Sequence, residues 1–214
     1  MMAIANPEEF EKKYVHDVYE QIAQHFNKTR FGVWSKVKNF INTLPKDNII
    51  ADIGSGNGKN MKMRPDKFIG CDMSDQLIDI CKKNKLNVVK GDVTNIPFAD
   101  NSVDNTICIA VLHHLSTQDR RIKGIEELVR ITKPKGTIMI QVWALEQDGK
   151  TGKEFKKQEN FVKWTDKQTN KTYERYYHVF QEYELEHLIK QIKGVTIIES
   201  FYEAGNWGVI VEKA

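Results

Sequence analysis

Cysteine is scarce in this chain, and what little there is fits no known framework. The 214 residues include only Cys71, Cys81 and Cys108. An odd number of cysteines at wide spacing matches neither a disulfide scaffold nor a zinc-binding pattern. We therefore expect buried thiols, no bound metal and a reducing compartment, which makes the cytoplasm the expected location.

Long apolar runs and a strong charge of one sign are also lacking. No stretch approaches the roughly 18 consecutive apolar residues of a membrane-spanning helix. The first residues carry no apolar segment of the kind found in a secretory signal. The 32 basic residues nearly balance the 29 acidic ones, which leaves a net charge of +3. That balance does not indicate a chain-wide nucleic-acid-binding surface, so any basic surface must be local.

What the sequence does contain is a regular alternation of apolar strands and helical patterns from residue 48 onward. The expected strands are 48–53, 67–72, 86–90, 104–111 and 136–143, and the expected helices are 74–84, with Ser74 as N-cap, 119–132 and 183–192. This alternation predicts a doubly wound α/β fold, in which helices cover both faces of a parallel sheet. Two closing strands, 196–202 and 207–212, predict a hairpin that adds an antiparallel edge.

The segments outside this alternation complete a single expected domain over residues 1–214. Helical periodicity at 8–26 and 32–44 predicts an N-terminal helical lid, about 7–45. Residues 144–180 lack a regular pattern but contain Phe155, Phe161, Trp164 and Tyr173, which are unfavourable in water. We expect this segment to pass over the carboxyl end of the sheet as an ordered, substrate-side excursion.

The strongest local motif is the loop Asp52-Ile53-Gly54-Ser55-Gly56-Asn57-Gly58, which follows the first expected strand. Gly54 suits a tight turn, and Gly56 and Gly58 let the backbone approach a ligand. The spacing is GxGxG with an acid two residues before the first glycine, whereas dinucleotide-binding loops follow GxGxxG. The loop therefore predicts a cofactor site and disfavours an NAD-dependent dehydrogenase.

Acidic residues also follow the second and third expected strands. Asp72 stands where doubly wound folds bind a ribose diol through a carboxylate, although capping of the next helix is an alternative role. In Gly91-Asp92-Val93, Asp92 can accept a hydrogen bond from an adenine amino group and Val93 can cover the ring. Because open α/β sheets bind ligands at the carboxyl ends of their strands, these residues together predict an adenosine-containing cofactor.

Several motifs resemble those of a known family. DIGSGNGK, GCDMS, KGDVTNIPFADNSVD and AVLHHLST are similar to the ordered motifs of class I S-adenosylmethionine (SAM)-dependent methyltransferases. More narrowly, YVHDVYEQIAQHFNKTRF, VWALEQ, RYYHVFQEYEL and GNWGVIVEK resemble the eukaryotic tRNA methyltransferases that esterify carboxymethyluridine at the wobble position. The resemblance implies SAM as cofactor and a Rossmann-like sheet of order 3-2-1-4-5-7-6 with one antiparallel strand. The chain departs from this family at Ser55, Asn60, Gln141 and Gly208, where Cys, an aromatic residue, Tyr and Trp are common.

The reaction implied by the resemblance is methyl transfer from the sulfonium of SAM to a carboxylate oxygen. A carboxylate is ionised at pH 7, because its ordinary pKa is about 4, so it needs no general base. Alignment of the reacting atoms becomes the main task. We expect Arg, His or Tyr side chains to orient the anion without a tight ion pair. The catalytic candidates are Arg30, His113, Arg175 and His178.

The remaining site candidates divide between cofactor and substrate. The cofactor-binding set is Tyr19, Asp52, Gly54, Gly56, Gly58, Asp72, Met73, Asp92, Val93 and Ala110, with Tyr19 closing the pocket and Asp52 facing the ammonium of the methionine part. The substrate-binding set is His114, Trp143, Tyr176 and Trp207, in which either tryptophan can stack on a base. Core packing is the alternative role for the histidines and tryptophans, and Arg30 is alternatively a surface cation.

The resemblance also implies two partners, a tRNA anticodon loop and a small zinc-binding activator protein. The phosphates of the loop need cations, and a rim could be formed by Arg120, Arg121 and Lys123 or by the lysines at 150, 153, 156, 157 and 163, although a solvated face explains the second set equally well. Strand 86–90 is an exposed apolar edge in the implied order. Such edges invite strand pairing, so we expect a heterodimer through it. The neighbouring lysines are alternatively a protection against pairing.

Two other functions stay open at this point. A SAM methyltransferase acting on a small molecule, such as a quinone or lipid precursor, has the same general motifs. A non-catalytic SAM- or partner-binding module is the second, and degenerate loop residues would favour it, whereas the glycine loop here is intact.

Overall fold

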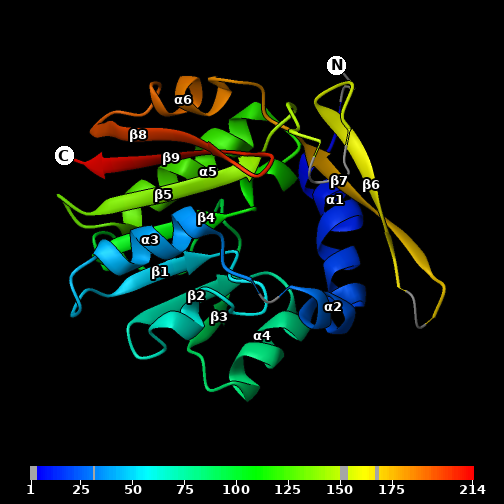
Figure 1. The fold of residues 1–214 in the computed structure, drawn as a ribbon, viewed down its shortest axis with the longest axis horizontal. Coiled ribbons are helices and arrows are strands. Elements are labelled where there is room, and N and C mark those ends of the chain that lie inside the picture. The colour runs from blue at the N-terminus through cyan, green and yellow to red at the C-terminus, as the bar shows by residue number, and fades with distance from the viewer. Residues whose placement is uncertain (1–3, 31, 150–153, 167–168) are drawn as a thin grey trace.

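The computed structural model describes residues 4–30, 32–149, 154–166 and 169–214. A seven-stranded sheet in the order β3-β2-β1-β4-β5-β9-β8 confirms the predicted doubly wound order, with β9 and β8 as its last two strands (Figure 1). β9 alone runs in the opposite direction to the other six strands of this sheet. The strands are β1 Ile50–Ile53, β2 Phe68–Asp72, β3 Val88–Lys90, β4 Asn105–Ile109, β5 Thr137–Trp143, β8 Val195–Glu203 and β9 Asn206–Lys213.

Helices cover both faces of this sheet. α5 (Gln118–Ile131) and α6 (Glu184–Ile189) pack on one face, and α3 (Ser35–Thr43) and α4 (Asp75–Lys83) pack on the other. On β4, Cys108 belongs to the first core cluster, whereas Ile107 and Ile109 belong to the second. Successive side chains of a strand point to opposite faces, so a strand covered on both sides must be apolar throughout. The side chain of Ser74 caps α4 as predicted, and the three cysteines are buried and free.

The N-terminal segment is less regular than its sequence pattern predicts. The expected helix at 8–26 consists of α1 (Pro7–Glu11), a π-helical turn (Lys12–His16) and α2 (Asp17–Thr29). A π turn inserts an extra residue and shifts the side chains that follow onto another face, so helical periodicity alone does not reveal it. Short 3₁₀ turns lie at Met61–Met63 and Leu112–His114.

The segment at 144–180, expected to be an ordered excursion although its sequence has no regular pattern, contains a hairpin. β6 (Glu159–Thr165) and β7 (Thr172–His178) form a separate antiparallel pair, and Val162 lies opposite Arg175. Trp164 of β6 is buried against Val18 and Ile22 of α2. Figure 1 shows α1, α2 and this hairpin standing together beyond the carboxyl ends of the parallel strands.

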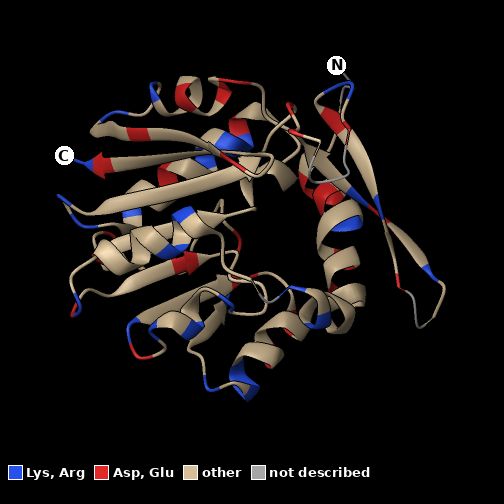
Figure 2. Cartoon of the chain, viewed as in Figure 1, with Lys and Arg blue, Asp and Glu red and all other residues tan. Residues whose placement is uncertain are grey.

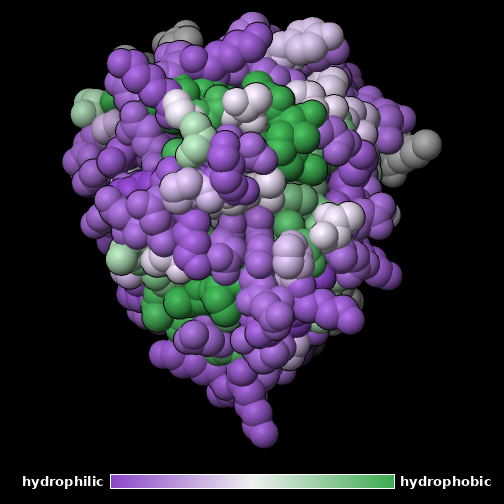
Figure 3. Space-filling model, turned by 90° about the vertical axis from the view of Figure 1, so that its left-hand side faces the viewer, coloured by the Kyte–Doolittle hydropathy of each residue, from purple (hydrophilic) through white to green (hydrophobic). Residues whose placement is uncertain are grey.

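Acidic and basic residues are mixed along the described part of the chain. Figure 2 shows acidic and basic residues interleaved over the sheet, the helices and the hairpin, in line with the small net charge. The face at the amino ends of the parallel strands is mostly hydrophilic, with separate apolar patches (Figure 3). Within the described residues, no helix has both the length and the apolar character needed to cross a membrane.

A buried glutamate attaches the N-terminal segment to the sheet domain. Glu11 is 1% exposed, and its Oε1 accepts hydrogen bonds from the backbone N–H and the hydroxyl of Ser116, at 2.6 and 2.8 Å. Its Oε2 accepts from Nε of Arg120 at 2.8 Å. A second acid, Glu20 of α2, accepts from the Ser74 hydroxyl at the start of α4. The carboxylates of Glu11 and Glu20 therefore attach the N-terminal segment to the loop before α5 and to the start of α4.

We expect Glu11→Ala to lower the free energy of unfolding by about 1–3 kcal/mol, because the Ser116 N–H loses its acceptor while staying buried. Urea unfolding measures the change, and Glu9→Ala, at an exposed position of the same helix, is the matched control. Equal losses in the two variants would contradict this role for Glu11.

Candidate active site

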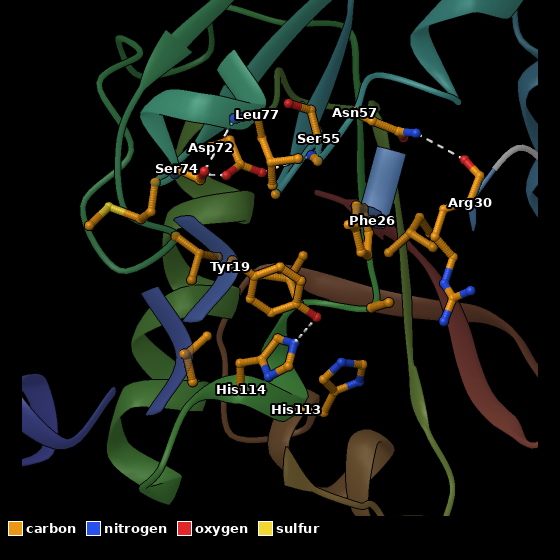
Figure 4. A pocket seen from close by; sticks show the side chains of 18 of the residues that line it. Tyr19, Phe26, Arg30, Ser55, Asn57, Asp72, Ser74, Leu77, His113 and His114 are labelled. Carbon is orange, nitrogen blue, oxygen red and sulfur yellow. Dashed lines mark hydrogen bonds between the residues drawn. The ribbon is translucent and has the colours of Figure 1, made fainter. Parts of the chain in front are cut away.

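A cavity of about 420 Å³ lies at the carboxyl ends of the parallel strands. Loops after β1, β2, β3 and β4 form one side, and α2, β7 and the turn between β8 and β9 close the other. Cavities of roughly 300–1,000 Å³ hold small molecules. Figure 4 shows side chains from these separate elements converging on the cavity.

The glycine loop forms the floor of this cavity. Gly54, Gly56 and Gly58 all have positive φ, at 73°, 57° and 71°. A Cβ on Gly54 would lie 2.2 Å from the side chain of Val111, so the loop and the turn after β4 approach too closely for any other residue. Gly58 does not line the cavity, because it faces Leu86 and Cys81, where a Cβ would lie 2.4 Å from Leu86 Cδ1. Its role is packing against α4 and the segment just before β3.

The first acid lies beneath the loop and not on the cavity wall. Asp52 is 1% exposed, and burial raises its pKa to about 7, partly opposed by a hydrogen bond from Asn60 and by the charge of Lys59. Asn60 and Lys59 do line the cavity. Asp52 is therefore linked to the cavity wall through its hydrogen bond with Asn60 and through its electrostatic interaction with Lys59.

The second and third acids line the cavity, and both also stabilise the surrounding loops. Asp72 accepts hydrogen bonds from the backbone N–H of Gly56 at 2.7 Å and of Ser74 at 3.0 Å, and burial raises its pKa. Asp92 accepts from the backbone and hydroxyl of Thr94. A carboxylate has about four acceptor sites, so each keeps capacity for a ligand. Met73 and Val93 line the same wall.

The turn after β4 holds a strained residue. Ala110 lines the cavity with φ at 63°, in the left-handed region that non-glycine residues rarely adopt. Its N–H donates to the carbonyl of Gln141 on β5, which fixes this conformation. Strain of this kind concentrates at ligand-binding sites.

Two histidines follow this turn, and their hydrogen bonds define their tautomers. His114 Nδ1 donates to the carbonyl of Tyr176, so Nε2 accepts from the hydroxyl of Tyr19 at 3.0 Å (Figure 4). Burial lowers the pKa of His114 to about 3, which keeps the ring neutral. His113 Nδ1 accepts from the backbone N–H of Trp143, so a neutral His113 carries its proton on Nε2.

Arg175 is the most unusual charge in the cavity. It is 4% exposed, and its guanidinium donates to the hydroxyl of Tyr19 at 3.2 Å. Its central carbon lies 4.8 Å from the ring centroid of Trp164 and 5.2 Å from that of Tyr177. In the described part of the chain, no carboxylate oxygen lies within 4.0 Å of this guanidinium, and its Nε has no partner. A buried cation without a carboxylate is a receptor for an anion.

Arg30 and Trp143 complete the walls predicted for substrate. Arg30 is exposed at the end of α2, with its guanidinium 5.1 Å from the ring centroid of Trp164 and its carbonyl bonded to Asn57 (Figure 4). Trp143 stacks on Tyr177, with ring centroids 4.2 Å apart and planes 12° from parallel. Two arginines thus share one indole at the hairpin side of the cavity.

Three predicted substrate-side residues do not reach the cavity. His178 is buried, with Nδ1 and Nε2 each 2.7 Å from a carboxylate of Glu159 or Glu184. Burial opposes the charged ring, but these two acids raise the pKa of His178. Tyr176 donates its hydroxyl to Glu159, and Trp207 donates its ring N–H to Glu146. All three anchor the hairpin or the sheet edge.

Strand geometry explains why these three side chains lie away from the cavity. Residues of a strand alternate between its faces, so Arg175 and Tyr177 share one side of β7 whereas Tyr176 and His178 share the other. Asn206, and not its neighbour Trp207, lines the cavity for the same reason.

The three residues of the cationic rim predicted at 120–123 make contacts within the chain. Arg120 binds Glu11 and Glu8, Arg121 is buried and donates to the carbonyl of Leu115, and Lys123 lies 3.6 Å from Glu127. Of the second set, Lys156, Lys157 and Lys163 are exposed on and beside the hairpin. Lys150 and Lys153 lie outside the described residues.

Sequence reasoning missed several cavity residues. The π turn places Val15 and His16 on the cavity wall, and a π turn leaves no signature in hydrophobic spacing. Lys59 and Asn60 directly follow the glycine loop and were within reach of motif analysis. Within the described residues, no group of three or more His, Cys, Asp or Glu side chains is placed to hold a metal ion.

Comparison with known proteins gives consistent matches. A family model described as a methyltransferase domain matches residues 51–140. The chain is 36% identical over 226 residues to the tRNA (carboxymethyluridine(34)-5-O)-methyltransferase of Schizosaccharomyces pombe, covering 96% of this chain and 98% of that protein. It is 34% identical over 258 residues to tRNA (carboxymethyluridine(34)-5-O)-methyltransferase alkbh8 of Xenopus tropicalis, covering 95% of this chain. The chain spans only 41% of that longer relative.

Solved structures share the fold at low sequence identity. The CcbJ methyltransferase of Streptomyces caelestis aligns with a TM-score of 0.72 at 14% identity, over 95% of this chain and 99% of that one. A chain in the complex between the Haloferax volcanii Trm112 methyltransferase activator and a putative methyltransferase aligns with a TM-score of 0.64 at 15% identity, over 95% and 96% of the two chains.

The raised pKa of Asp52 predicts a pH-dependent stability. In the unfolded chain this carboxyl ionises near its ordinary pKa of 3.8, whereas in the folded protein the pKa is about 7. Between these values the folded protein holds a proton that the unfolded chain has lost, so this contribution to stability declines as pH rises and is fully lost above pH 7. We expect Asp52→Asn to stabilise the ligand-free protein at pH 8 by a few kcal/mol, at about 1.4 kcal/mol per pKa unit, and to have little effect at pH 4.

Urea unfolding at the two pH values measures this change. Asp79→Asn, which replaces an exposed acid on α4, serves as the control. An Asp52→Asn variant that is less stable than the wild type at pH 8 would contradict the uncompensated burial of Asp52.

Proposed function

The chain belongs to the tRNA carboxymethyluridine methyltransferase family, and from this membership we propose that it methylates the carboxylate of a carboxymethyl-modified wobble uridine in a tRNA anticodon loop. SAM is the methyl donor, and the product is the methyl ester. The observation that carries the proposal is the buried guanidinium of Arg175, which faces the cavity without a carboxylate partner in the described part of the chain.

The cavity floor fits the methyl donor. Acids stand at the ends of β1 and β2 and after β3, and the hydroxyl of Ser55 and Oδ1 of Asn60 are buried polar atoms without a partner in the described residues. Such atoms are costly unless a ligand satisfies them. Asp72 and Asp92 suit the ribose and adenine groups, and Val93 suits the face of the ring. When bound, the donor supplies a methyl group activated by a positively charged sulfur.

The opposite side of the cavity fits a carboxylate acceptor. The acceptor is ionised at neutral pH, so no residue needs to remove a proton from it. Arg175 holds the anion, and Tyr19, oriented by neutral His114, fixes the direction of the guanidinium. Because aromatic rings and a hydroxyl, not a carboxylate, hold Arg175, its donors stay available. Positioning of reacting groups contributes roughly 7–11 kcal/mol in favourable cases.

The remaining walls fit a nucleotide in a loop. Trp143 and Tyr177 present a stacked aromatic pair, and the ring of His113 packs against both of them. The wobble base is already unpaired, so its entry into the cavity costs less than extraction from a duplex. The α1–α2 segment acts as a lid over the donor, while Arg30 and the exposed lysines at 156, 157 and 163 contact the backbone phosphates.

We expect Arg175→Leu to lower methyl transfer to tRNA by about 100-fold or more, as removal of one preorganised donor does in other enzymes. The affinity for S-adenosylhomocysteine should stay within about twofold, since Arg175 lies on the acceptor side. Arg175→Lys keeps the charge but not the planar fork, so its rate should be intermediate. The assay uses labelled SAM and tRNA that lacks the wobble ester, followed by digestion to nucleosides. Label in any product other than a carboxymethyluridine ester would overturn the proposed function.

We also propose that β3 docks a small zinc-binding activator protein. β3 is an edge of the sheet, with Val88 buried and Val89 36% exposed beside it. A free edge allows a partner to add a strand. A structural neighbour is described as a complex with the Trm112 methyltransferase activator, which supports an activator protein as the partner.

Val89→Lys should weaken the activator complex by about tenfold or more, because it places a charge at the centre of the contact. Ile198→Lys, on the opposite edge strand β8 and 56% exposed, is the matched control and should bind normally. Co-purification of the two chains and titration by calorimetry measure both. A complex that tolerates Val89→Lys as well as Ile198→Lys would exclude this edge.

A further inference from the structure

His178, at the end of β7, lies between two carboxylates from separate elements. Its Nδ1 donates to Oε1 of Glu159 on β6, and its Nε2 donates to Oε1 of Glu184 on α6, both at 2.7 Å. The histidine side chain is 5% exposed. A neutral imidazole has one donor nitrogen and one acceptor nitrogen, so two such contacts require a ring with both nitrogens protonated. We call this imidazolium and its two acids the His178 clamp.

The acids of the His178 clamp have their oxygens occupied within the chain. Oε2 of Glu159 accepts from the hydroxyl of Tyr176. Oε2 of Glu184 accepts from the backbone N–H of Gln181 at 3.1 Å and from the side-chain amide of Gln158. All four carboxylate oxygens therefore accept at least one hydrogen bond, and the three clamp residues do not line the cavity. An effect of the clamp on the reaction must pass through the structure that it holds.

The charges around the ring balance only when His178 is protonated. Glu159 and Glu184 contribute two negative charges, and Arg121 of α5 contributes a positive charge at longer range. Arg121 itself donates to the carbonyl of Leu115. The other titratable or charged groups near the clamp, on α1, α5 and β7, are Glu11, Arg120 and Tyr176. A neutral ring would leave two partly buried acids with one cation at longer range, which is an unfavourable arrangement away from water.

The hairpin that carries His178 depends on such contacts because it is separate from the main sheet. β6 and β7 form a two-stranded sheet of their own (Figure 1). An isolated two-stranded hairpin is marginally stable in water. Glu184 belongs to α6, which packs on the main sheet, so its contact with His178 attaches the end of β7 to the rest of the domain.

Arg175 lies three residues before His178 on the same strand. Its guanidinium contacts the hydroxyl of Tyr19 and the rings of Trp164 and Tyr177. Ring contacts are less directional than an ion pair with a carboxylate, so the placement of β7 decides where this guanidinium lies in the cavity.

We propose that His178 is a positioning residue for methyl transfer, which as an imidazolium between Glu159 and Glu184 fixes β7 and thereby sets Arg175 against the carboxylate acceptor. Loss of the ring proton at alkaline pH weakens the attachment of β7 to α6. Use of the acceptor then falls, while binding of the methyl donor is unchanged. The inference deepens the proposed function and rests on it for the identity of the acceptor.

The pKa shifts of the clamp set the direction of this pH dependence. Burial opposes the charged ring, but the hydrogen bonds to Glu159 and Glu184 raise the pKa of His178 above its ordinary value of 6.5. Burial also opposes the charge of the two acids, but the hydrogen bonds from His178 lower their pKa below 4.5. A raised histidine pKa gives a contribution to stability that is complete below pH 6.5 and is lost as pH rises through the folded-state value.

Glu159→Gln is the variant that tests the clamp without removing its hydrogen bonds. The amide oxygen can still accept from His178, and the amide nitrogen can donate to the hydroxyl of Tyr176. Glu174→Gln, at an exposed acid of the same hairpin, is the matched control. Methyl transfer to tRNA lacking the wobble ester is measured at saturating SAM between about pH 6 and about pH 9. The affinity for S-adenosylhomocysteine and amide hydrogen exchange of residues 172–178 are measured over the same range.

We expect Glu159→Gln to lose methyl transfer at a pH about 1–3 units lower than the wild type does, because one charge beside a histidine shifts its pKa by about that amount. Hydrogen exchange of β7 should accelerate over the same lowered range. At the acid end of the range the variant should match the wild-type rate within about twofold, which a merely structural defect would not allow. Affinity for S-adenosylhomocysteine should equal that of the wild type at each pH, and Glu174→Gln should follow the wild type throughout.

Two results would overturn the inference. Superimposable pH profiles for Glu159→Gln and Glu174→Gln would mean that the charge of His178 does not position Arg175. An equal alkaline loss of S-adenosylhomocysteine binding in Glu159→Gln would mean that the clamp supports the whole fold and not the acceptor side. By contrast, the expected shift in hydrogen exchange in a chain that methylates no tRNA at any pH would leave the clamp standing and overturn the proposed function.

Discussion

The side of the cavity proposed for the substrate depends on one interaction, the burial of the Arg175 guanidinium without a carboxylate partner in the described part of the chain. Burying an unpaired charge is costly, so the structure must replace water around Arg175 with other polar and polarisable groups. It does so with the hydroxyl of Tyr19 and the rings of Trp164 and Tyr177. Tyr19 is in turn oriented by His114, whose ring is fixed by the carbonyl of Tyr176. A chain of contacts from α2 through the 3₁₀ turn to β7 thus keeps one cation ready for an anion.

The cavity separates charge in a way that matches the reaction proposed for it. Acids gather under and beside the glycine loop, at Asp52, Asp72 and Asp92, on the side proposed for the cationic methyl donor. The arginines lie across the cavity, on the hairpin and at the end of α2. A donor that is positive at sulfur and an acceptor that is negative at oxygen are therefore each drawn to their own side. The field of the site opposes a reversed placement of the two substrates.

Buried polar contacts attach the elements that close the cavity, in addition to the apolar packing of α2 against α4 and Trp164. Glu11 and Glu20 join the N-terminal segment to the loop before α5 and to the start of α4. His178, between Glu159 and Glu184, joins the hairpin to α6. Hydrogen bonds are directional, so such contacts fix an orientation that apolar packing alone would leave loose. Such structural contacts also explain why a residue type common in active sites, such as His178, lies outside the cavity.

The sequence by itself determined the parallel sheet, its flanking helices and the acidic, glycine-rich side of the cavity. Those features depend on local spacing and on the rule that parallel strands end at one edge, both readable along the chain. The order of the strands and the identity of the donor came from family motifs. Only the tertiary structure decided the other side. A polar hairpin has no apolar alternation to reveal it, and without the hairpin nothing separates Arg175 from His178, three residues apart on opposite faces of one strand. The π turn that brings His16 to the cavity, and the carboxylates that bury His178, come from segments far apart in sequence, so no local pattern encodes them.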